Sequence, residues 1–138
     1  MVTGKSKIKV LLALFPLENH SRGIITVAGM LRDAGMEVVL IGNDLPERII
    51  DTAIQEDVDV VGVSSLGGAH LSLGSMLIDR AVQEGIKGQV AFFMGGVFSP
   101  EDGEKMEELG FDGVFPPGST RDEIVTAIRN AATGKNAS

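Results

Sequence analysis

Short apolar segments alternate with longer amphipathic ones along the chain, and this alternation restricts the possible folds more than any other feature. Five of the segments are too short for a helix and are rich in β-branched or aromatic residues, which is typical of buried β-strands. They are Ile8–Leu14, Val38–Gly42, Val58–Ser64, Gln89–Met94 and Phe111–Phe115. The sequence therefore predicts five strands, each one buried.

The segments that follow these strands place apolar residues at helical spacing. The residues that indicate the five helices are Ile24, Val27, Ala28 and Leu31; Ile49, Ile50, Ala53 and Ile54; Leu73, Met76 and Leu77; Met106 and Leu109; and Ile124, Ala127, Ile128 and Ala131. Gly35, Gly85 and Gly110 follow three of the helices, where a left-handed C-terminal cap favours glycine. Strands and helices are thus expected to alternate strictly.

Strict alternation with short links requires parallel strands, right-handed crossovers and helices on both faces of the sheet. The chain has 138 residues, of which 43% are apolar, and this is enough for the core of one domain. We therefore expect an α/β fold of the flavodoxin-like type: a doubly wound, five-stranded parallel sheet of order 2-1-3-4-5, formed by residues 7–132. Residues 1–6 and 133–138 are polar and aperiodic, and we expect them to be frayed tails.

Charge and composition exclude several classes of function. The formal net charge of −7 argues against sequence-independent binding to nucleic acid or to an anionic membrane, because both require a surplus of Lys and Arg. The chain has no cysteine, which excludes disulfides, thiolate metal sites and cysteine nucleophiles. It shows no 18-residue apolar span and no signal-peptide pattern, so we expect a cytoplasmic protein with no membrane partner.

Ligands of open α/β sheets bind outside the carboxyl ends of the strands. The five segments expected at that edge read FPLENHSRG, GNDLP, SSLGGAH, GGVFSP and FPPGST. Four of them, all but the second, are dense in glycine, serine or histidine. We therefore expect the site to lie across the first, third, fourth and fifth of these segments.

The first of these segments carries Glu18 and His20 two residues apart. Taken alone, the pair is better explained as a helix cap and a solvated charge than as a working pair. A conventional zinc site needs three or four ligands, but the only histidines are His20 and His70, and Ser64 lacks the GxSxG context of a nucleophilic serine. One histidine suffices, however, if a macrocycle supplies the other ligands of a metal and a carboxylate orients the imidazole.

The same residues resemble the signature of the cobalamin-binding domain of adenosylcobalamin-dependent mutases, DxHxxG followed by SxL and GG. Here the three motifs read ENHSRG (18–23), SSL (64–66) and GG (95–96), in the same order and at similar spacing. The resemblance extends from about Ile8 to Ile128. The stretches EDVDVVGVSSLGGAH, GGVFSPED and FPPGS are similar to the methylmalonyl-CoA mutase branch in particular.

The resemblance implies a role for each matching residue. His20 would be the lower axial ligand of cobalt, replacing the cofactor's own dimethylbenzimidazole base, and Gly23 would let the next helix start close to the corrin. The slot for the displaced nucleotide tail would be lined by the SxL and GG motifs, and Ser119 would supply a hydroxyl to it. The full set of expected cofactor-binding residues is Glu18, Asn19, His20, Ser21, Arg22, Gly23, Ser64, Leu66, Gly68, Gly95, Gly96, Val97, Phe115, Gly118 and Ser119.

Glu18 departs from the family pattern, which has Asp at this position. The extra methylene moves the carboxylate by about 1.5 Å, so a direct bond to His20 and a bond through water both stay open. The amide of Asn19 is a further candidate for orienting the imidazole. We expect His70, which lies outside the signature, at the rim of the pocket or at a subunit interface.

The resemblance implies the cobalamin-binding small subunit of a carbon-skeleton acyl-CoA mutase, an isomerase with adenosylcobalamin as cofactor. The cobalt ligand His20 is then the only residue of this chain that takes part in the chemistry. Catalysis would require a large subunit whose substrate-binding barrel holds the acyl-CoA, because 138 residues are too few to form that barrel as well. Two alternatives stay open: a corrinoid methyl carrier of a methyltransferase system, and a non-catalytic binding or regulatory module of flavodoxin-like fold.

Overall fold

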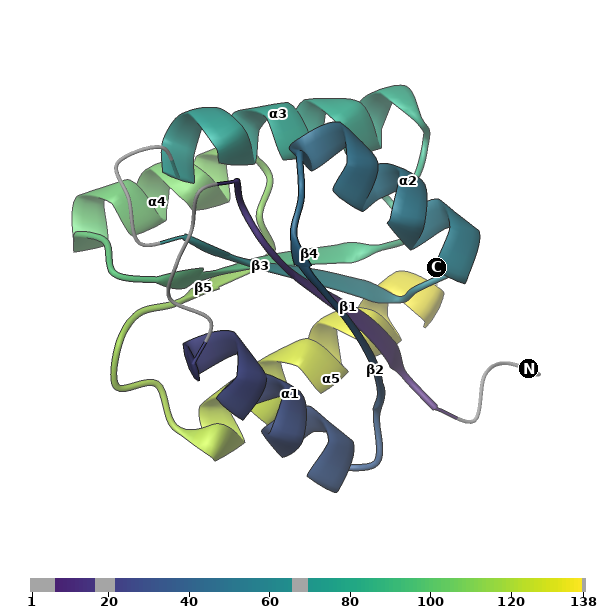
Figure 1. Ribbon diagram of the computed structural model, residues 1–138, viewed down its shortest axis with the longest axis vertical. Coiled ribbons are helices and arrows are strands. Elements are labelled where there is room, and N and C mark those ends of the chain that lie inside the picture. Colours follow the sequence, from purple (N-terminus) through teal and green to yellow (C-terminus); the bar gives the residue numbers. More distant parts are fainter. Residues whose placement is uncertain (1–6, 17–21, 66–69, 138) are drawn as a thin grey trace.

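The computed structural model describes residues 7–16, 22–65 and 70–137, and the five expected strands and five expected helices are all present in it (Figure 1). The strands are β1 (Lys9–Leu14), β2 (Glu37–Asn43), β3 (Val60–Ser65), β4 (Ala91–Gly96) and β5 (Gly113–Phe115). The helices are α1 (Arg22–Asp33), α2 (Pro46–Glu56), α3 (His70–Gln83), α4 (Pro100–Leu109) and α5 (Arg121–Ala137).

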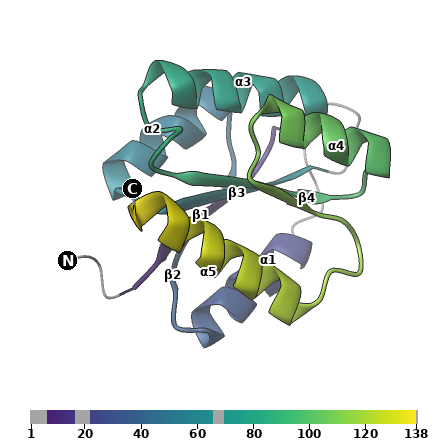
Figure 2. The same ribbon diagram turned by 180° about the vertical axis from the view of Figure 1, so that it is seen from behind.

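The strands form one parallel sheet of order β2-β1-β3-β4-β5, as expected for the flavodoxin-like fold. Helices α2, α3 and α4 cover one face, and α1 and α5 cover the other (Figures 1 and 2). We call these the packed face and the cavity face, respectively, for the reasons given below. Each face has its own cluster of buried apolar side chains, so the sheet separates two cores.

The ends of the helices agree with the sequence in three cases. Gly35, Gly85 and Gly110 have positive φ angles of 91°, 77° and 124° and follow α1, α3 and α4, as expected. Helix α2 ends instead at Asp57, which has a left-handed φ of 53° and donates its backbone N–H to the last carbonyls of the helix. No glycine marks this end, so the sequence pattern does not reveal its cap.

The end of α5 corrects the expected domain boundary. The helix continues to Ala137, so residues 133–137 are helical rather than a frayed tail. Extending an existing helix fixes one residue for each new hydrogen bond, and it is therefore much less costly than starting a helix. This explains how α5 extends past the fully buried Ala132 without an apolar stripe in the sequence to predict it.

Two aspartates tie the strands together at the amino end of the sheet. The carboxylate of Asp59 accepts a hydrogen bond from the backbone N–H of Lys9 at 2.9 Å, and that of Asp112 accepts one from Phe92 at 2.8 Å. Each aspartate precedes a strand and bonds to the adjacent one. Hydrogen bonds within the chain thus hold the amino ends of these strands together. The glycine-rich segments lie at the opposite, carboxyl ends of the strands.

Candidate functional site

Two rows of side chains cross the cavity face, and both combine large residues with very small ones. Parallel pairing aligns the first row as Leu12, Gly62, Phe93 and Gly113. The second row lies two residues nearer the carboxyl ends and contains Leu14, Ser64, Gly95 and Phe115. Because alternate residues of a strand point to the same face, β3 presents only Gly62 and Ser64 in these rows, and β4 presents Phe93 beside Gly95.

A cavity of about 480 Å³ lies above these small residues, between the sheet and helices α1 and α5. This volume falls within the range of about 300–1,000 Å³ that is usual for sites of small organic ligands. Its floor is formed by β3 and β4, and its walls include apolar side chains of both helices. The helical wall residues are Ile24, Val27, Met30, Ile124 and Ile128.

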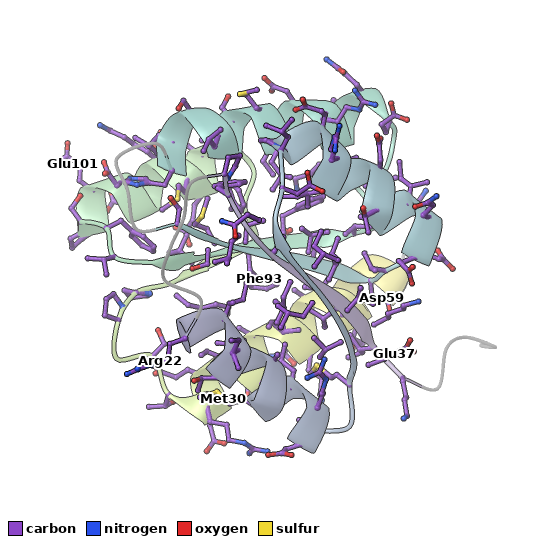
Figure 3. The ribbon with its side chains drawn as sticks, viewed as in Figure 1. Arg22, Met30, Glu37, Asp59, Phe93 and Glu101 are labelled. Carbon is purple, nitrogen blue, oxygen red and sulfur yellow. The ribbon has the colours of Figure 1, made fainter. Side chains whose placement is uncertain are left out.

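A pair of stacked aromatic rings forms one wall of the cavity. The rings of Phe93 and Phe115 lie 5.2 Å apart, centroid to centroid, and are tilted by only 7° from parallel. A Cβ atom on Gly113 would lie 2.8 Å from the ring of Phe93, so glycine is needed beside it. In Figure 3 the labelled Phe93 side chain extends from the sheet on the side of α1 and α5.

The GG motif meets the end of β3 at very close range. Gly96 pairs with Ser65, and a Cβ atom at Gly96 would collide with the backbone carbonyl of Ser65. Gly96 also has a φ of 141°, which side-chain-bearing residues rarely adopt. Gly95 lines the cavity, and among the described residues an added Cβ atom would meet only the carbonyl of Phe115, at 3.8 Å. The two glycines therefore differ: Gly96 permits a close approach of two strands, and Gly95 leaves space.

The polar lining residues lie near the carboxyl edge of the sheet. Arg22 is the first residue of α1, and its backbone carbonyl accepts a 3.0 Å hydrogen bond from the hydroxyl of Thr26. Ser119 donates its hydroxyl to the carbonyl of Pro116 at 2.7 Å, and Gly118, with a φ of 89°, forms the turn between them. These groups give the mouth of the cavity a polar character.

Helix α5 begins beside this mouth with a reciprocal cap. The backbone N–H of Thr120 donates to the carboxylate of Glu123 at 2.7 Å, and the backbone N–H of Glu123 donates to the hydroxyl of Thr120 at 3.1 Å. The first of these bonds holds the pKa of Glu123 below its usual value because it favours the charged carboxylate. The cap fixes where α5 begins, next to the turn that carries Ser119.

Every expected binding residue within the described part of the chain lines the cavity. These residues are Arg22, Gly23, Ser64, Gly95, Gly96, Val97, Phe115, Gly118 and Ser119. The remaining ones, Glu18, Asn19, His20, Ser21, Leu66 and Gly68, lie outside the described residues. No lining residue comes from β2 or the GNDLP segment, in line with the expectation that this segment stands apart from the site.

The apolar walls are the part of the cavity that motif reasoning missed. Ile24 and Ile128 were recognised as core residues of helices, and they are almost fully buried, but they line the cavity as well. Phe93 was treated only as part of a strand. One signal in the sequence could have revealed these walls, namely the very small residues among large ones on β3 and β4. Small residues at these positions leave space between the sheet and the helix above it.

His70 lies on the other side of the sheet from the cavity. It begins α3, is buried, and bonds through Nε2 to the carboxylate of Asp102 in α4 at 2.8 Å. Its ring also lies 6.1 Å from that of Phe98, centroid to centroid. His70 is not among the described residues that line the cavity, and its expected position at the rim stays a prediction. The side chain connects α3 to α4, and a role at a subunit interface stays a prediction.

Two searches of the described residues concern other kinds of site. Residues 7–16, 22–65 and 70–137 contain no group of three or more His, Asp or Glu side chains that could hold a metal ion. No helix in the same part of the chain is both long and apolar enough to cross a membrane.

Comparison with known proteins gives consistent matches. Residues 8–126 match the model of a family described as the B12 binding domain. Over 134 residues the chain is 37% identical to the 2-hydroxyisobutanoyl-CoA mutase small subunit of Aquincola tertiaricarbonis, a match that covers 96% of this chain and 98% of that protein. Over 127 residues it is 35% identical to the pivalyl-CoA mutase small subunit of Xanthobacter autotrophicus, covering 91% of this chain and 84% of that one.

A solved structure shows the same fold. The cobalamin-binding protein from Desulfitobacterium hafniense DCB-2 superposes with a TM-score of 0.78 at 22% sequence identity. The superposition covers 91% of this chain and 60% of that one. The architecture described above is therefore shared with a protein described as cobalamin-binding.

Proposed function

The chain belongs to the B12-binding domain family, and from this premise we propose that it is the cobalamin-carrying small subunit of an acyl-CoA mutase with adenosylcobalamin as its cofactor. Two relatives that this chain matches over most of their length are named as mutase small subunits. The observation that carries the proposal is the cavity beneath α1 and α5, which opens at the edge of the sheet where the signature motifs lie.

The residues present fit a corrinoid with a displaced nucleotide tail. Such a tail needs a narrow slot beside the sheet, and Gly62, Ser64 and Gly95 provide it by leaving the backbone of β3 and β4 uncovered. The stacked rings of Phe93 and Phe115 form a flat apolar wall for an aromatic base. The polar groups at the mouth are suited to the ribose and phosphate of the tail.

Each part of the chain has a distinct task in this proposal. When bound, the cofactor supplies a cobalt–carbon bond whose homolysis starts the carbon-skeleton rearrangement. His20 would hold the cobalt, and Glu18 or Asn19 would orient its imidazole. Gly23 allows α1 to start close to the corrin, and the cavity walls keep water from the buried tail. The protein thus supplies binding and orientation, and the cofactor supplies the reactive bond.

A large mutase subunit completes the enzyme in this proposal. It binds the acyl-CoA in its own barrel and covers the upper face of the corrin, while this chain holds the lower face. We therefore expect no turnover from the isolated chain and activity when its large subunit is added. Turnover by the isolated chain would contradict this division of tasks. A cytoplasmic location stays a prediction.

The test of the cobalt ligand is a titration of the purified chain with cobalamin, followed by absorption spectroscopy. We expect the wild type to give the spectrum of cobalamin bound with its own base displaced and a histidine in its place. His20→Gln should lose this spectrum, because glutamine cannot replace the imidazole nitrogen. The matched control is His70→Gln, which changes the other of the two histidines, located away from the cavity.

Two results would count against this assignment. If His20→Gln gives the wild-type spectrum, His20 is not the ligand of the cobalt. If the wild-type chain binds no corrinoid, the proposed function itself is wrong. A Glu18→Asp variant adds one detail: tighter binding is expected if the longer carboxylate is a compromise, and unchanged binding means that Glu18 is not the partner of His20.

A further inference from the structure

The two central strands β3 and β4 end side by side, and the helices that follow both of them lie on the packed face. Ser65, the last residue of β3, pairs with Gly96, the last residue of β4. Helix α3 begins at His70 and α4 at Pro100, and the two helices are neighbours on the packed face (Figures 1 and 2). Val97, in the link from β4 to α4, lines the cavity on the other side of the sheet. This link therefore connects the two faces.

A hydrogen bond joins the first turns of these two helices. Nε2 of His70 lies 2.8 Å from a carboxylate oxygen of Asp102, and Nε2 donates because an ionised carboxylate can only accept. The imidazole side chain is 9% exposed and the carboxylate side chain 28%. The backbone N–H of Asp102 donates to the hydroxyl of Ser99, which caps α4. The bond thus ties the start of α3 to the capped start of α4.

The ring of His70 also lies against the link that carries Val97. The ring of Phe98 is 6.1 Å from it, centroid to centroid, and tilted by 47°, which is within the range of interacting aromatic rings. On the side of α4, a Cβ atom at Gly103 would lie 3.5 Å from the ring of Phe98. Phe98 directly follows Val97 in the chain, so any shift of Phe98 moves Val97 with it. The packing around His70 therefore affects the wall of the cavity.

The bond between His70 and Asp102 is better suited to fixing positions than to stabilising the fold. Asp102 belongs to the first turn of α4, where the helix dipole favours a negative charge even without a partner. Replacing a buried polar pair by apolar side chains of similar volume is often neutral for stability. A hydrogen bond, however, depends steeply on distance and angle. It restricts how far the first turns of α3 and α4 can move relative to each other.

We infer that His70 and Asp102 are positioning residues for the binding site, although both lie on the packed face. Their bond holds the link after β4, and with it Val97, in the place where the nucleotide tail of the corrinoid fits. The inference rests on the proposed function, because it assigns the cavity to that tail. It gives the second histidine of the chain a task separate from that of the cobalt ligand.

Three variants test the bond. His70→Leu removes it and keeps an apolar side chain to fill the space. His70→Gln is the conservative variant, because its side-chain amide can donate from nearly the position of Nε2. The matched control is Arg80→Leu, which breaks the 3.2 Å ion pair to Asp51 of α2 from the last turn of α3. It removes another polar link of α3, at the end away from the first turn.

Absorption titration measures the affinity of the full chain for cobalamin and for cobinamide, which lacks the nucleotide tail. His70→Leu should bind cobalamin at least about fivefold more weakly, the effect of one hydrogen bond, and should bind cobinamide as the wild type does. Its melting temperature should stay within about 4 °C of the wild-type value. His70→Gln and Arg80→Leu should keep wild-type affinity for both corrinoids.

Asp102→Ala breaks the same bond from α4, whose Ser99 cap is retained, and should reproduce the result of His70→Leu. If His70→Leu fails to fold, the two titrations of Asp102→Ala decide.

The outcomes separate this inference from the proposed function. If His70→Leu binds cobalamin as the wild type does, or loses affinity for both corrinoids equally, the pair does not position the tail, and the inference is overturned while the proposed function stands. A His70→Gln variant as weak as His70→Leu would show that the bond is not the cause, with the same conclusion. If the wild type binds neither corrinoid, the proposed function fails, and this inference fails with it.

Discussion

On the packed face, the central strands present unbroken rows of apolar side chains, and on the cavity face the same strands combine large side chains with glycine and serine. Toward α2, α3 and α4, the paired rows are Leu11, Val61 and Phe92, then Ala13, Val63 and Met94, all at most 3% exposed. Toward α1 and α5, the middle positions are Gly62, Ser64 and Gly95. The strand Val60–Ser65 therefore specifies a filled core with one set of alternate residues and a binding slot with the other.

The largest expected effect contrasts two neighbours on β4. Phe92 is fully buried on the packed face, so Phe92→Ala leaves a new cavity and should lower the free energy of unfolding by about 3–5 kcal/mol. Phe93 borders space that already exists, so Phe93→Ala should cost about 1–3 kcal/mol, mainly lost burial and stacking on Phe115. Urea unfolding of the two variants measures both values.

Corrinoid binding should reverse this order. At a urea concentration of zero, Phe92→Ala should keep near wild-type affinity for cobalamin as long as it is folded, and Phe93→Ala should bind more weakly because it loses a wall of the cavity. If the two variants lose equal stability and equal affinity, the faces of the sheet are not distinct in function.

A smaller effect is expected from two glycines that line the cavity. Gly96→Ala should destabilise the chain by about 2–4 kcal/mol, because its φ is positive and its Cβ would collide with the carbonyl of Ser65. A Cβ at Gly23 would meet no atom of the described residues within 4 Å, and alanine favours the helix, so Gly23→Ala should leave stability unchanged or raise it by up to about 1 kcal/mol. Thermal unfolding compares the pair.

Affinity for cobalamin gives the second measurement on these glycines. Gly23→Ala should bind cobalamin more weakly despite its unimpaired stability, since the added methyl lies where α1 is proposed to approach the corrin. Unchanged affinity in this variant would remove Gly23 from the site.

The smallest effect concerns the cap of α5, the helix that closes the cavity face. The pKa of Glu123 is lowered in the folded chain by its bond from Thr120, so the stabilisation is present above the unfolded-state value of about 4.5 and is lost as the pH falls through the folded-state pKa. Glu123→Gln should show a slightly weaker decline in melting temperature below about pH 4.5 than the wild type. Identical pH profiles would mean that the bond contributes nothing to stability.

The fold could be predicted almost completely from the sequence, and the reason lies in its periodicities. Each strand is a short β-branched or aromatic run, and parallel order follows from alternation with helices. The features that escaped prediction lack such a signal. Asp57 adopts a left-handed conformation without being glycine, and α5 continues to Ala137 by helix propagation alone.

The candidate site could be predicted only where motifs mark it. Gly95, Gly96 and Ser119 were expected and do line the cavity, because the carboxyl ends of parallel strands meet at one edge. The walls contributed by Met30 and Ile128 were not, since a helical stripe looks the same whether it faces a core or a cavity. Whether a helical stripe touches the sheet depends on the size of the strand residues that face it. Those residues are determined by the strand register, which a sequence pattern does not show. The bond of His70 to Asp102 was not predicted for a related reason, because Asp102 belongs to a different helix.

The floor of the cavity is main chain, and this has a consequence for how such a protein can evolve. A residue such as Gly62 has no side chain left to shorten, so mutation can only raise the floor and never lower it; an added Cβ would already lie 2.8 Å from Leu12. Substitutions that enlarge the cavity must therefore come from its walls, which are the side chains of α1 and α5 and the two stacked phenylalanines.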